Sequence, residues 1–155
     1  MTGNSILTRF GLAGKGLRLR QARSHPNMHD LWRQPARLPP FVATTPGALR
    51  VLDLLGPLDW AGFPERNLER NWGQTTVPYA ALAAACLLKL NEGLLSMGKL
   101  RSYLLEHPGF IWLCGFPLVP CRHAVHGFDA EASLPTQRHL TQVLAICRIR
   151  RCNSC

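Results

Sequence analysis

The sequence predicts an all-α fold, a small bundle of about five helices preceded by a basic N-terminal arm. Apolar residues make up 46% of the 155 residues, which is typical of a globular protein. After residue 45 they recur at helical spacing, and no segment alternates apolar and polar residues as a half-buried strand does. The longest apolar run, VPYAALAAACLL, ends at Lys89 and is too short to cross a bilayer, so we expect a buried helix and no membrane partner.

The predicted domain boundary lies between residues 45 and 46. Residues 1–45 are rich in Gly, Arg, His and Pro and show no apolar face longer than one turn, so we expect a largely disordered arm. The helical domain is expected over residues 46–146, with Thr45 as the cap of its first helix. This helix would place Leu49, Leu52 and Leu55 on one stripe and end at the following Gly-Pro pair.

Four further helices are expected after a polar connection. One runs over about 78–92, stops at Gly93 and is apolar almost all round, so we expect it to be the central helix. The next begins at a Ser96 cap and ends at Pro108. The segment GFIWLCGF predicts a two-turn buried helix, residues 117–133 predict a loop, and LPT before QRHLTQVL predicts the start of the last helix.

The positive charge is unevenly distributed. The formal net charge is +9, and residues 1–50 carry eight Lys or Arg against one acidic residue. Basic ends around a nearly neutral centre suggest segments that contact a polyanion such as nucleic acid, although a solvated terminus has the same composition. In the DNA-binding interpretation, the phosphate contacts of the arm would be Arg9, Lys15, Arg18, Arg20 and Arg23.

A second candidate for DNA contact is the pair of helices joined by NEGLLS. A short turn containing Gly between two helices is the pattern of a helix-turn-helix, and an ordinary helical hairpin shares it. The outer face of the second helix would carry Ser96, Lys99, Arg101 and Ser102. Arg138 in the last helix is a further candidate contact.

No metal site is predicted. Cysteine and histidine gather around the expected loop, at Cys114, Cys121, His123 and His126. Their spacing differs from that of the usual tetrahedral zinc sites. Cys114 also falls within an apolar segment, where a free cysteine behaves as a small hydrophobic residue.

No catalytic residue or small-molecule substrate is predicted either. Asp129 and Glu131 form a close acidic pair, but no third ligand for a metal ion stands near them in the sequence. No nucleophile has a base beside it. The N-terminus lacks the continuous apolar block of a secretory signal, so we expect a cytoplasmic protein with reduced cysteines.

Several phrases resemble one known family. LDLLGPLDW, KLNEG, LLEHPGFIWLCGFPLVP and GFDAEASLPTQRHL occur in this order, and the block over residues 47–144 resembles the N-terminal region of bacterial insertion-sequence transposases of the DDE type. The resemblance implies a helical domain that helps to bind the terminal repeats of a mobile element, and hence an association with the nucleoid. It also implies that a catalytic core with three Mg²⁺-binding carboxylates follows this region, so we expect the chain itself to be neither an enzyme nor a holder of cofactors.

The tail at residues 147–155, CRIRRCNSC, is predicted to be frameshifted coding sequence. The resemblance implies that the helix continues with a pattern close to LPNxALQxLL at this point. When the codons are read from the last base of codon 146, they permit Leu-Pro-Asn-Ser-Ala-Leu-Gln-Leu-Leu. A one-base shift therefore explains why Cys and Arg crowd together there.

The sequence thus predicts a truncated transposase fragment whose partner is DNA, with self-association left open. One alternative is a non-functional, poorly folded product of a pseudogene. The other is a small zinc-binding module that combines the loop histidines with Cys147, Cys152 and Cys155.

Overall fold

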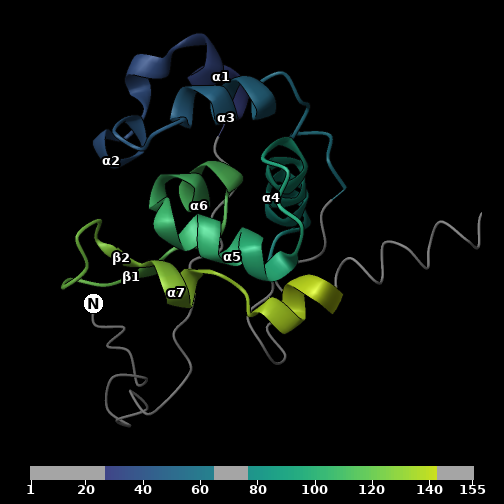
Figure 1. Ribbon diagram of the computed structural model, residues 1–155. Coiled ribbons are helices and arrows are strands. Elements are labelled where there is room, and N and C mark those ends of the chain that lie inside the picture. Colours follow the sequence, from purple (N-terminus) through teal and green to yellow (C-terminus); the bar gives the residue numbers. More distant parts are fainter. Residues whose placement is uncertain (1–26, 65–76, 143–155) are drawn as a thin grey trace, which may run out of the picture.

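The computed structural model describes residues 27–64 and 77–142. Helices α1 to α3 form an upper layer, α4 to α6 lie beneath it, and a small hairpin with α7 lies below these (Figure 1). The elements are, in order, α1 (Met28–Arg33), the 3-10 helix η2 (Pro35–Arg37), α2 (Pro40–Ala43), α3 (Ala48–Leu55), α4 (Tyr79–Asn91), α5 (Met97–Glu106), α6 (Pro108–Cys114), β1 (Val119–Pro120), β2 (Phe128–Asp129) and α7 (Ala130–Ser133). A further helical stretch, residues 137–142, ends the described chain.

The prediction of a mostly helical fold is confirmed, whereas a bundle of five helices is not. The described residues hold seven α-helices with both ends defined, several of them only one or two turns long. They also hold a two-stranded antiparallel ladder inside the segment predicted to be a loop, with Val119 opposite Asp129. Ser133 fixes this ladder, because its buried hydroxyl accepts from Val119 N at 2.9 Å and donates to Asp129 O.

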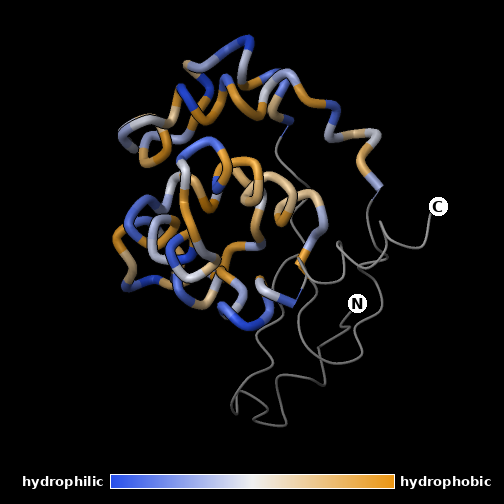
Figure 2. The backbone as a smooth tube through the Cα atoms, turned by 45° about the vertical axis from the view of Figure 1, so that its right-hand side comes forward, coloured by the Kyte–Doolittle hydropathy of each residue, from blue (hydrophilic) through white to orange (hydrophobic). Residues whose placement is uncertain are grey.

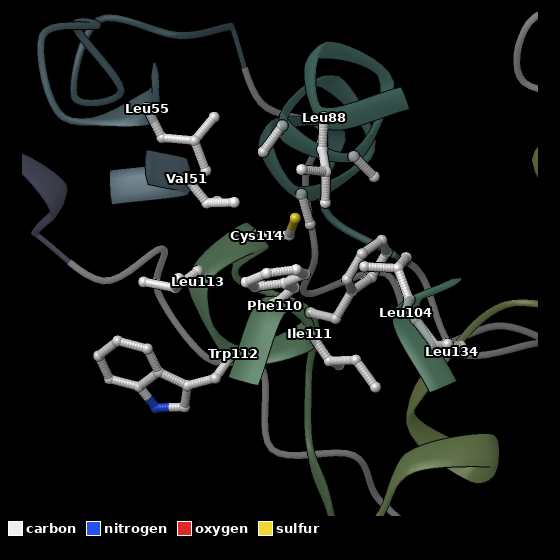
Figure 3. Packing of buried hydrophobic residues seen from close by; sticks show 14 of the residues in the cluster. Val51, Leu55, Leu88, Leu104, Phe110, Ile111, Trp112, Leu113, Cys114 and Leu134 are labelled. Carbon is white, nitrogen blue, oxygen red and sulfur yellow. The ribbon is translucent and has the colours of Figure 1, made fainter. Parts of the chain in front are cut away.

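Helix α6 lies at the centre of the core. The predicted two-turn helix is confirmed here, and its residues from Gly109 to Cys114 are all buried. It contacts α2, α3, α4, α5 and α7. Phe110 and Cys114 lie between side chains of α3 and α4 (Figure 3). The expectation that residues 78–92 form the central helix is therefore wrong, because α4 covers only one side of α6 and leaves Leu90 73% exposed.

A close approach brings α2 onto α6. A Cβ atom on Gly109 would collide with the side chain of Thr45 and would lie 3.2 Å from Val42 Cα. Thr45 does not cap the first expected helix, because Gly47 is the N-cap residue of α3. The Thr45 hydroxyl donates to Phe41 O at 2.8 Å instead. Only glycine fits at residue 109 in this packing.

Residues 27–45 differ from the disordered arm that the sequence predicts. They form α1, η2 and α2, and Met28, Leu38 and Val42 belong to the hydrophobic core. Prolines begin η2 and α2, so each element is too short to show a recurring apolar face in the sequence. Of the expected arm, residues 1–26 lie outside the described residues, and so do the expected contacts Arg9, Lys15, Arg18, Arg20 and Arg23.

The first expected helix is present as α3, with a different buried face. Val51, Leu52 and Leu55 are buried, but Leu49 is 59% exposed. Hydrophobic stretches occur in both helical layers, that of α1 to α3 and that of α4 to α6, and hydrophilic turns lie at the periphery (Figure 2). The layer of α1 to α3 therefore packs through a stripe that passes through Val51 instead of Leu49.

A matched pair of leucine substitutions tests the central position of α6. Leu113→Ala removes a fully buried side chain and should lower the free energy of unfolding by about 2–5 kcal/mol. Leu90→Ala on the exposed side of α4 should change it by less than about 0.5 kcal/mol. Urea unfolding followed by circular dichroism measures both, and equal effects would contradict the burial of α6.

Candidate nucleic-acid interface

The described residues are close to neutral as a whole. They contain eight Lys or Arg and seven Asp or Glu, so their formal net charge is +1. Most of the net charge of +9 therefore belongs to residues 1–26 and 143–155, which carry five and three basic residues and no acidic ones. A DNA contact by the described helices must depend on where individual cations lie.

The turn between α4 and α5 has the predicted form. Gly93 follows α4 in the left-handed conformation, with φ +64°. Ser96 caps α5, because its Oγ accepts from Lys99 N at 3.1 Å. Both α4 and α5 pack on α6, which fixes their relative orientation.

An ion pair holds this turn against α3. The Arg50 guanidinium lies 2.9 Å from Glu92 Oε1, and the Glu92 side chain is only 14% exposed. Burial, and then the charge of Glu92, raise the pKa of Tyr103 above its ordinary value. Arg50 from α3 and Tyr103 from α5 thus both reach Glu92 at the end of α4.

The outer face of α5 offers fewer cations than the sequence predicts. Lys99 and Ser102 are exposed there. The guanidinium group of Arg101 is engaged within the protein. Its Nε donates to Pro135 O at 3.2 Å, and its Nη atoms lie 3.4–3.5 Å from Glu131 Oε1. With a side chain only 21% exposed, Arg101 connects α5 to the segment that follows α7.

The start of the last helix lies against α5. A Cβ atom on Gly98 would lie 3.0–3.2 Å from the side-chain amide group of Gln137, so this amide packs over Gly98. As predicted, a threonine opens this helix: Thr136 Oγ1 accepts from His139 N at 3.3 Å. Leu140 is 3% exposed and anchors the helix in the core, while Arg138 is exposed.

The structure therefore brings three of the predicted contacts into one region. Lys99 and Arg101 belong to α5 and Arg138 to residues 137–142, and these two segments are in contact through Gly98 with Gln137 and Arg101 with Pro135. The exposed polar residues Gln137, Thr141 and Gln142 belong to the same region. They were missed because nothing in the sequence alone indicates that α5 and the last helix are neighbours.

The loop that holds cysteine and histidine borders an open hollow. The hollow of about 600 Å³ is lined by His123, His126, Asp129 and Glu131, together with Cys121 and apolar side chains. Cys114 points into the core (Figure 3). Within residues 27–64 and 77–142, no three His, Cys, Asp or Glu side chains are grouped to hold a metal ion. The tail cysteines of the zinc alternative lie outside the described residues.

Comparisons of the chain with protein-family models, with curated proteins and with solved structures found no match. Among the helices of the described residues, none is both long and apolar enough to cross a membrane.

The two cysteines at the hollow and in the core should differ in reactivity. Burial, with a smaller contribution from Cys86, raises the pKa of Cys114 to about 12. The thiolate is the nucleophile, so iodoacetamide at pH 8 should label the half-exposed Cys121 and spare Cys114. Fragmentation mass spectrometry locates the label, and in urea both residues should react. Equal labelling in the native protein would show that Cys114 is accessible.

Proposed function

We propose that the chain is the N-terminal helical part of a DDE transposase of an insertion sequence, and that it binds DNA at the terminal repeats of the element. The observation that carries the proposal is the ordered set of phrases over residues 47–144 that resembles this family. Two of them, LLEHPGFIWLCGFPLVP and GFDAEASLPTQRHL, form α6, the hairpin and the start of the last helix. The residues that carry the resemblance are thus largely those that build the core.

In this proposal the basic ends of the chain supply the affinity for DNA, and the helical domain determines where on the DNA the chain binds. Lys and Arg bind duplex DNA by displacing counterions from phosphates, whatever the base sequence. The five cations within residues 1–26 and the three within residues 143–155 suit this role. The cutting and joining of DNA, and the Mg²⁺ that they need, belong to the catalytic domain that the resemblance places after this region.

The proposal also includes a change of reading frame at residue 147. The resemblance ends near Leu144, and the composition changes abruptly in the tail. The shifted codons permit the expected helical continuation, and thus explain three cysteines and three arginines within nine residues.

The salt dependence of DNA binding tests the proposal. Fluorescence anisotropy would measure the affinity of the full chain for a duplex of the terminal repeat that flanks the gene, between 50 and 200 mM salt. Replacing Arg9, Lys15, Arg18, Arg20 and Arg23 together by Gln should flatten the slope of log K against log salt by up to about 4.5, because each phosphate contact contributes about 0.9.

The matched control replaces exposed cations of the folded part, with Arg33→Gln, Arg37→Gln and Arg122→Gln in one chain. This control should change the slope by much less than the five arm substitutions do. A full chain that binds neither the terminal repeat nor a scrambled duplex at 50 mM salt would refute the proposal and favour a non-functional product.

A further inference from the structure

The outer side of α5 carries two opposite charges that form no ion pair within the described residues. Lys99, Ser102 and Glu106 are exposed and follow one another at intervals of three and four residues, so they lie in one stripe along the helix. No residue three or four positions from Lys99 or Glu106 is charged, so neither can form an ion pair within α5. Neither takes part in the ion pairs that the described residues form with other elements.

The stability of α5 itself does not explain these two charges. Because of the helix macrodipole, the N-terminus of a helix favours acidic side chains and the C-terminus favours basic ones. Lys99 lies in the first turn of α5 and Glu106 is its last residue, so each charge has the less favourable sign for its position. This placement indicates that the two charges interact with a partner outside the helix.

The stripe is complementary to a second copy of itself. When two copies of α5 pack side by side in antiparallel orientation, Lys99 of one copy lies opposite Glu106 of the other, and the twofold axis generates the same pair again. In parallel orientation, like charges would face each other. Ser102 lies close to the midpoint of the stripe, where its small side chain permits the two helices to approach.

We propose that the outer stripe of α5, formed by Lys99, Ser102 and Glu106, is the contact through which two copies of the chain associate as an antiparallel pair of helices. The inference goes beyond the proposed function, because it does not depend on DNA. Duplex DNA fits the stripe less well, since its phosphates would repel Glu106.

Features at the two ends of the stripe add apolar contact to this pair. Leu95, one residue before the cap of α5, is 95% exposed. The open hollow lies beside the other end of α5, with Leu105, Pro108 and Phe128 among its lining residues. Antiparallel packing brings the N-terminal end of one α5 beside the C-terminal end of the other, so it places Leu95 of each copy near the hollow of the other.

The expected dimer is weak. Exposed ion pairs contribute little in water, and a contact made by one helix and one hollow is smaller than the roughly 800 Å² per partner that is typical of stable complexes. The dimer population should therefore rise with protein concentration and fall with added salt, which screens both ion pairs.

Sedimentation velocity of the full chain over a range of concentrations tests the proposal. Lys99→Glu and Glu106→Lys should each raise the dissociation constant about tenfold, because each replaces two attractive pairs by two repulsive ones. Neither change should unfold α5, since each introduces the charge that its end of the helix favours. The double variant restores both pairs and should return the dissociation constant close to the wild-type value. As a control, Arg37→Glu makes an equal change of charge at an exposed position of η2 and should leave the dissociation constant unchanged.

An equimolar mixture of the two single variants provides a second test. The stripe of each variant carries one sign of charge, and the two variants carry opposite signs. The mixture should therefore form dimers at concentrations where each variant alone is monomeric. Leu95→Ala should weaken the wild-type dimer, whereas Leu58→Ala, at an exposed leucine just after α3, should not.

A full chain that sediments as a monomer at every concentration up to about 1 mM would overturn the inference. A dimer that both single variants leave intact would also overturn it, because the contact would then lie elsewhere. If the single variants change the affinity for a DNA duplex and not the sedimentation, the stripe is a DNA contact, and the proposed function stands without this inference. Failure of the full chain to bind DNA would refute the proposed function and leave the dimer contact standing.

Discussion

The burial of α6 is the constraint on which the rest of the structure depends. A helix of seven residues cannot be stable alone, so its formation requires the elements around it. Phe110, Ile111 and Leu113 are fully buried, and each such side chain contributes about 1.5–3 kcal/mol through removal from water. Because α2, α3, α4, α5 and α7 all pack on α6, it places segments that are far apart in sequence.

The candidate interface is a consequence of that placement. Helix α5 packs on α6 and contributes Leu100 and Leu104 to the core, and the last helix reaches the core through Leu140. Arg101 then joins the two by a hydrogen bond across 34 residues of sequence. A charged side chain that the sequence suggests as a DNA contact thus serves chiefly to orient its neighbours, and the exposed donors around it are left for a partner.

Local sequence signals predicted α4 to α6 well, because the residues that begin and end these helices lie at the helix ends themselves. Ser96 caps α5, and Gly93 stops the preceding helix. The fold of residues 27–45 could not be predicted in this way, since short proline-started turns gain their stability from distant partners. The exposure of Leu49 and the engagement of Arg101 also depend on which helix lies opposite, and so do the polar residues of the last helix that belong to the candidate interface.

The nucleotide sequence of the gene through codon 146 and several hundred bases beyond tests the central claim most directly. We predict that the shifted frame stays open, continues the last helix with Leu-Pro-Asn or a close variant, and later encodes three well-spaced acidic residues. This prediction would be contradicted by a shifted frame that closes within a few codons. The cysteines and arginines of residues 147–155 would then be encoded in the gene's original reading frame. A frameshift in a transposase gene would no longer explain the composition of the tail.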